Sequence, residues 1–352
     1  MDEQKLASRV KEAVAEVVRK QVDTGLDVID DGEFGKPSFV TYIRDRLGGL
    51  EPIGVRPNAW LSSREAMTFP DYYKQQESAS PRAKQVQMAC TSPLTYKGQA
   101  ALKAELDTLK TALQGVENVA DVFVPCISPA NIEDWNENKY YASNDEYLLA
   151  IADAMNVEYK MIVDEGFLLQ VDDPRLVSYY LMDPKMSVED IRRWASKRVE
   201  TLNHALRGIP TEKIRYHTCY SINMGPRVHD LEVRHIIDIL TQIRTGAFSF
   251  EASNPRHEHE WTVWKEAKLP KDTVLIPGVI TNSSVLVEHP ELVAQRITRF
   301  AEFMGRENVI AGTDCGFASF AGSDEVHASI VWAKMEALVR GAEIASKELW
   351  GR

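Results

Sequence analysis

Short apolar segments alternate with longer amphipathic segments along most of the chain. Eight short segments have the length and composition of β-strands, and several end in polar residues: 26–33, 84–90, 119–126, 166–173, 213–219, 246–253, 273–280 and 308–316. Most are continuous apolar runs rather than strict alternations, which is typical of parallel strands covered by helices.

The longer segments carry helical patterns, and two have recognisable ends. In 144–166, Asn144 is the expected N-cap and Gly166 the expected C-cap. The helix predicted over 187–208 begins at Ser187, with Glu189 and Asp190 in its first turn. Further helices are predicted at 289–308 and 323–350, after the last two strands.

Strands and helices in alternation predict an α/β protein, a (β/α)8 barrel formed as a single domain over residues 1–352. A doubly wound open sheet is the alternative, although no G-x-G-x-x-G follows a strand and no Walker loop is present. Residues 48–82 are less regular and hold several Pro and Ser residues, so we expect a long loop inserted on the barrel.

Composition narrows the class of protein. A net charge of −11 over 352 residues argues against a nucleic-acid partner, which would need a basic face. No apolar run is long enough to span a membrane, and the start, "MDEQKLASRVKEAV", has no apolar core of a secretory signal. Four widely spaced cysteines favour a reduced, cytoplasmic protein. A homo-oligomer of this acidic, one-domain chain is possible.

Reactive side chains lie at several predicted strand ends, where the active site of such a barrel forms. His217 and Cys219, in "RYHTCYS", lie two apart and so share one face of their strand. Glu251 ends the next strand, and Asp314 and Cys315 end the last. Histidine, cysteine and carboxylate side chains are the ligands that zinc prefers, so a metal site is one interpretation.

Two other interpretations of His217 and Cys219 stay open: a Cys–His nucleophile pair, or two buried residues without a chemical role. Cys90 and Cys126 also end strands, and we expect both to be buried thiols. In "NPRHEHEW", the histidines at 257 and 259 alternate with glutamates, which favours a solvated helix start over metal ligation.

Acidic residues follow two other strands. Asp30, Asp31 and Glu33 come after the first, and Asp172 and Asp173 after the fourth. Such carboxylates either bind a substrate amine or hydroxyl, or cap the segment that follows. Their position beside the strand ends favours Glu33 and Asp172 as substrate-binding residues.

Several of these motifs, taken in order, resemble a known family. "YHTC", "FSFEASNPRHEHEW", "IPGV" and "GTDCGF", with "GLDVIDDGEF" and "LLQVDDP", are similar to the zinc barrel of the cobalamin-independent methionine synthases. They are even more similar to the related epoxyalkane:coenzyme M transferase, and the resemblance covers roughly residues 8–350.

The resemblance implies a zinc ion held by His217, Cys219, Glu251 and Cys315, with Glu33 and Asp172 facing a small thiol substrate. Zinc favours thiolate over thiol at neutral pH, and the carboxylate is the ligand expected to yield to the incoming sulfur. The implied activity is methyl or alkyl transfer to homocysteine or a similar thiol, as in methionine biosynthesis. The alternatives are thiol addition to an epoxide, a non-catalytic metal-binding barrel, and a metal-free lyase or decarboxylase.

The chain departs from the family pattern in three places. It begins inside the expected first helix, so either the start is truncated or another strand, such as 119–126, closes the barrel. Asn282, Ser283 and Ser284 follow "PGVI" where the methionine synthases carry a proton-donating histidine, so the proton donor is not identified. Tyr96 replaces the tryptophan of the folate site and the folate-binding half is missing, which disfavours methyl-tetrahydrofolate as donor.

Overall fold

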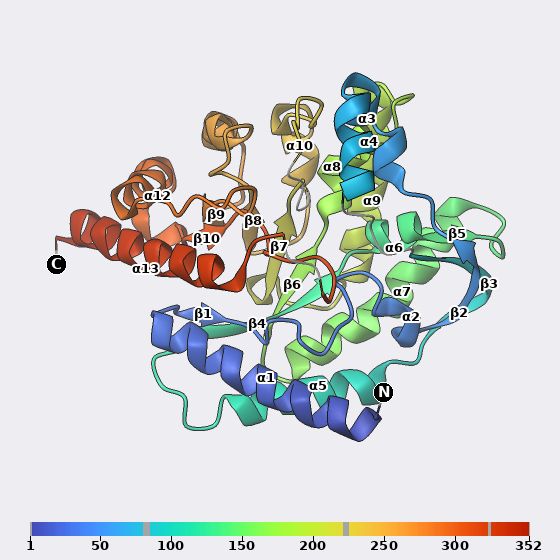
Figure 1. Ribbon diagram of the computed structural model, residues 1–352, viewed down its shortest axis with the longest axis horizontal. Coiled ribbons are helices and arrows are strands. Elements are labelled where there is room, and N and C mark those ends of the chain that lie inside the picture. Colours follow the sequence, from blue (N-terminus) through green and yellow to red (C-terminus); the bar gives the residue numbers. More distant parts are fainter. Residues whose placement is uncertain (1, 80–84, 221–224, 323–324, 352) are drawn as a thin grey trace.

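The computed structural model describes residues 2–79, 85–220, 225–322 and 325–351. Its centre is a curled sheet in which all neighbouring strands are parallel (Figure 1). Seven strands of the described residues form it, in this order: β1 (Val28–Ile29), β4 (Asp121–Ile127), β6 (Leu168–Asp172), β7 (Ile214–Thr218), β8 (Ala247–Phe250), β9 (Val274–Ile280) and β10 (Gly312–Thr313). The predicted α/β class and barrel-type architecture are confirmed.

Helices connect the strands and lie outside the curl (Figure 1). The long ones are α1 (Glu3–Thr24), α5 (Gln99–Ala112), α7 (Asn144–Asp164), α9 (Val188–Ala205), α12 (Pro290–Met304) and α13 (Ala328–Trp350). The shorter ones are α2 (Ile43–Arg46), α6 (Pro129–Trp135), α8 (Pro174–Met182), α10 (Ile237–Leu240) and α11 (Trp261–Glu266). None of the helices in these described ranges combines the length and apolarity needed to cross a membrane.

One predicted barrel strand is in a different sheet. The segment expected at 84–90 is β3 (Val86–Tyr96), which pairs with β2 (Leu47–Val55) and β5 (Asn136–Asn138) in a separate three-stranded sheet. The prediction of its place was wrong because β2, its antiparallel partner, comes from the segment that looked like a loop. Residue 84 itself lies outside the described residues.

The segment 48–82 is not a long loop, and that prediction was also wrong. It contains most of β2, a 3-10 turn (Ala59–Ser62), α3 (Arg64–Thr68) and α4 (Pro70–Ala79), while residues 80–82 lie outside the described part. The segment "LGGLEPIGV" contains three glycines and Pro52, which are uncommon within strands, so its sequence did not indicate a strand. β2 is an edge strand with two shifts in register, which is where a sheet tolerates proline and glycine.

The helix ends differ slightly from the prediction. Ser143, not Asn144, caps α7, because its hydroxyl accepts a hydrogen bond from the Glu146 amide. Gly166 follows the C-cap in the left-handed conformation, at φ +96°. The predicted start at Ser187 is confirmed, with a reciprocal capping box to Asp190. α13 begins at Ala328, and residues 323–324 of its predicted range are outside the described part.

The barrel core is closely filled by large side chains from strands and helices. Tyr147 and Tyr159 of α7, Tyr216 of β7, Phe248 of β8 and Phe300 of α12 are all fully buried. A smaller apolar cluster lies between β9, α12 and α13. Because the strands are parallel, their carboxyl ends and the residues that follow them meet at one rim.

Candidate metal centre

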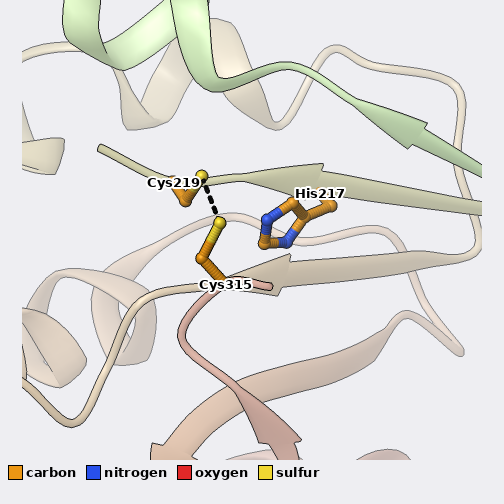
Figure 2. A group of neighbouring side chains, drawn as sticks. All are labelled: His217, Cys219 and Cys315. Atoms are coloured by element: carbon orange, nitrogen blue, oxygen red, sulfur yellow. Dashed lines mark hydrogen bonds between the residues drawn. The ribbon is translucent and has the colours of Figure 1, made fainter. Parts of the chain in front are cut away.

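Three potential metal ligands converge at this rim. His217 lies in β7, Cys219 directly follows it, and Cys315 lies two residues beyond β10 (Figure 2). Their ligand atoms all lie within 4.8 Å of one another, and the two sulfurs are 3.0 Å apart. His217 and Cys219 are buried and Cys315 is partly exposed.

The neighbouring strand orients His217. The register of β7 and β8 places Ser249 opposite His217, and the serine Oγ lies 3.2 Å from the histidine Nδ1. With Nδ1 engaged by this hydroxyl, Nε2 is the nitrogen available to a metal. A partner on the second ring nitrogen is a regular feature of metal-binding histidines.

Contacts within the cluster shift the pKa values of His217 and Cys219. Burial acts to lower the pKa of His217, but the hydrogen bond and charge of Cys219 outweigh it and raise that pKa to about 9. A hydrogen bond with Cys315, together with burial, raises the pKa of Cys219 well above its ordinary value. A divalent cation removes such protons, since it binds thiolate and neutral imidazole.

A close approach between β9 and β10 positions Cys315. Gly278 pairs with Gly312, and a Cβ added at Gly278 would lie 2.2 Å from Asp314 Oδ1. The buried Asp314 carboxylate accepts hydrogen bonds from the amides of Ala252 and Ser253, at 2.8 and 2.9 Å. The "PGV" and "TDCG" motifs are therefore coupled, because the glycine of one makes room for the aspartate of the other.

Glu251, the fourth predicted ligand, directly follows β8 and its side chain is completely buried. Its Oε1 accepts a 2.7 Å hydrogen bond from the Tyr220 amide. Its Oε2 accepts hydrogen bonds from Arg227 Nη2 and Asn254 Nδ2, each at 2.7 Å. Glu251 is thus at the expected rim with both oxygens engaged, and its role as a ligand stays a prediction.

The two predicted substrate-binding acids belong to the same rim. Asp172 ends β6, in register with His217, and accepts a 3.0 Å hydrogen bond from Gln170. Burial raises the pKa of Asp172 to about 6, with His217 opposing the rise and the charge of Glu33 adding to it. Glu33 pairs at 3.0 Å with Lys36, whose Nζ also donates to the Pro125 carbonyl of β4.

Asp30 and Asp31, the other acidic residues after β1, stabilise the turn that follows this strand. Asp30 accepts a hydrogen bond from the Gly32 amide, and Asp31 accepts one from the Glu33 amide, each at 2.9 Å. Glu33 itself has φ +55°, a conformation that non-glycine residues adopt rarely. The two aspartates therefore hold the backbone turn that presents Glu33.

Other candidates fall outside the cluster. Cys90 and Cys126 are confirmed as buried thiols. His259 is exposed, as expected for a solvated helix start, but His257 is not. His257 is buried between Asp230 and Glu260, at 3.1 and 2.9 Å, and that part of the interpretation was wrong. The buried partner Asp230 comes from a distant loop, which the local pattern did not reveal.

Two functional candidates were missed from the sequence. Ser249 lies two residues before Glu251, so strand alternation placed it on the same face and could have identified it. Arg227, in the loop after β7, had no such signal.

Of the residues after β9, Asn282 is buried and donates to the Gly316 carbonyl, and Ser283 contacts Arg227.

Comparison with known proteins identifies the family of this chain. Residues 90–338 match the model of the family described as "Cobalamin-independent synthase, Catalytic domain". The match covers well over half of the chain, and the chain belongs to this family.

Curated relatives and solved structures extend the similarity over the whole chain. The methionine synthase of Thermococcus kodakarensis is 24% identical over 353 residues, covering 99% of this chain and 87% of the relative. That of Pyrococcus horikoshii is 23% identical over 351 residues, with 99% and 86% covered. The fold is similar to a B12-independent methionine synthase from a Shewanella species, solved with selenomethionine, with a TM-score of 0.77 and 17% identity, covering 100% of this chain and 92% of that one.

Proposed function

We propose that residues 1–352 form one domain that acts as a zinc-dependent transferase, moving a methyl or other alkyl group to the sulfur of a small thiol. The observation that carries the proposal is the convergence of His217, Cys219 and Cys315 at the catalytic rim of a cobalamin-independent synthase fold. The absence of disulfides among the four cysteines is consistent with action in the reducing cytoplasm.

The donor set fits zinc. Two thiolates and one imidazole suit a tetrahedral zinc ion, and catalytic zinc sites combine three protein ligands with an exchangeable position. We infer that Glu251 is the fourth protein group near that position. A zinc ion at the site would supply one thing: it would lower the pKa of a substrate thiol, so that the thiolate is present at neutral pH.

The protein's own residues would bind and orient the substrate. Asp172 and Glu33 are the groups to accept hydrogen bonds from a substrate ammonium, and Lys36 holds Glu33 in place. The related proteins from Thermococcus and Pyrococcus bear the name methionine synthase, which supports homocysteine as the first thiol to test.

The test begins with metal content and thiol chemistry. We expect about one zinc per chain in protein purified without chelators, and release of a proton when homocysteine is added. Methyl-folate, a methylated corrinoid and an epoxide would then be offered separately as alkyl donors. Protein that binds no zinc, or that binds zinc and releases no proton with any thiol, would refute the proposal.

A further inference from the structure

Arg227 contacts Glu251, the predicted fourth ligand of the candidate metal centre. Its side chain is buried, and its guanidinium donates to three different groups. Nη2 lies 2.7 Å from Glu251 Oε2, Nε lies 2.8 Å from Asp230 Oδ2, and Nη1 lies 3.1 Å from Ser283 Oγ. Arg227 therefore connects the predicted fourth ligand to the loop after β9.

The segment inserted between β2 and β3 holds this arginine in place. Glu65 of α3 is fully buried and accepts hydrogen bonds from the amides of Arg227 and His229, at 3.1 and 2.8 Å. Thr68 of the same helix adds a 2.7 Å contact to the His229 ring. These contacts support Arg227 at φ +59°, a strained backbone conformation that persists only where its surroundings maintain it.

The charges around Arg227 allow Glu251 to have two partners. A carboxylate that leaves a metal inside a buried site needs another cation, because an unpaired buried charge is strongly unfavourable. Arg227 is already within hydrogen-bond distance of Glu251. If Glu251 turned toward a metal instead, Arg227 would still be paired with Asp230. Arg227 thus has a buried carboxylate partner in both arrangements.

We propose that Arg227 is a positioning residue that competes with the metal for Glu251, and so makes Glu251 the group that a substrate thiol displaces. This role rests on the proposed function, and it explains how the coordination position of Glu251 on the zinc ion would become available to the substrate thiol. Arg227 acts in two ways: it withdraws electron density from the carboxylate, which weakens it as a ligand, and it receives the carboxylate after displacement.

The experiment measures metal and thiol affinity rather than turnover. Zinc affinity, by competition with a chromogenic chelator, and homocysteine affinity, by calorimetry on the zinc-loaded protein, would be compared in four proteins: wild type, Arg227→Gln, Glu251→Gln and the double variant. Arg46→Gln is the matched control, since Arg46 is equally buried and pairs with Glu105, and neither residue is a predicted metal ligand or substrate-binding residue.

With Arg227→Gln we expect zinc to bind about tenfold more tightly and homocysteine about tenfold more weakly, the scale at which groups behind metal ligands act. In the Glu251→Gln background the same substitution should change neither affinity. Arg46→Gln should leave both affinities as in the wild type.

Unchanged affinities in Arg227→Gln, or equal changes with and without Glu251, would overturn the inference while leaving the transferase proposal intact. Wild-type protein that binds no zinc would instead refute the proposed function. If Arg227→Gln does not fold, Ser283→Ala, which removes only the Nη1 contact, should shift the two affinities in the same directions by a smaller factor, and no shift there would equally overturn the inference.

Discussion

The sulfur atoms of Cys219 and Cys315 lie 3.0 Å apart although the two residues are 96 positions apart in the chain. Replacing either with serine removes one soft ligand, and we expect zinc content to fall from about one per chain to near zero. Metal analysis by mass spectrometry measures this. Cys90→Ser is the matched control, because Cys90 is buried in the separate three-stranded sheet and donates to the Ser92 carbonyl. Equal loss of zinc in the control would contradict the assignment.

Ser249→Ala should weaken the metal site without removing a ligand. The hydroxyl at His217 Nδ1 orients the imidazole, and loss of such a partner typically costs about 10- to 100-fold in metal affinity. Competition with a chromogenic chelator measures the zinc affinity of the wild type and of the variant. Thr245→Val serves as control, since it removes a buried hydroxyl two residues before the same strand begins. Zinc affinity equal to wild type in Ser249→Ala would show that Ser249 has no orienting role.

Gly278→Ala should displace Cys315 and weaken zinc binding. The added methyl group would collide with Asp314, whose backbone N lies 2.5 Å from the Cβ position, and Asp314 directly precedes the cysteine. Gly316→Ala is the control on the other side of Cys315, because a Cβ there meets nothing within 4 Å. The prediction fails if both variants bind zinc equally well.

Glu33→Gln and Asp172→Asn should discriminate between two thiols. Homocysteine carries an ammonium group that these carboxylates can pair with, whereas 4-mercaptobutanoate lacks it. We expect each variant to bind homocysteine about 10- to 100-fold more weakly, the size of a lost hydrogen bond to a charged group, and 4-mercaptobutanoate nearly as the wild type does. Titration calorimetry with the zinc-loaded proteins measures the affinities of the wild type and of each variant for the two thiols. An equal loss for both thiols would mean that the acids do not bind the amino group.

The ion pairs of His257 predict a pH dependence of stability. Burial disfavours its charge, but the hydrogen bonds that its ring donates to Asp230 and Glu260 outweigh this effect and raise its pKa from 6.5 to about 9. Because the folded state holds this proton more tightly, the stabilisation is complete below about pH 6.5 and is lost as pH rises through 9.

Wild type should therefore exceed His257→Gln in free energy of unfolding by on the order of 3 kcal/mol at most at pH 6, and the difference should shrink toward pH 9.5. Urea denaturation across this range provides the measurement. The exposed neighbour His259, changed to Gln, is the control and should show no such trend. A difference that is independent of pH would indicate a packing effect instead.

Local pattern was enough to predict most of the barrel. Apolar runs of strand length, with amphipathic helices between them, identified seven strands of the curled sheet. Cap residues identified the helix start at Ser187 and placed a helix end at Gly166, one residue after the observed C-cap Glu165. Because parallel strands end at one rim, the polar residues at those ends could be placed together before any contact was known. His217, Cys219 and Cys315 were found in this way.

Contacts between distant segments decided the rest. The residues of β3 are those of a barrel strand, but β3 pairs with β2 in the separate sheet. The sheet to which a strand belongs depends on its pairing partner, which its own residues do not specify. Likewise Arg227 became a candidate only because Glu65, 162 positions away, holds its backbone amide and Glu251 receives its guanidinium. Sequence alone determined which residues could form a metal site; the tertiary structure determined their charge partners, because hydrogen bonds across such separations leave no periodic trace in the chain.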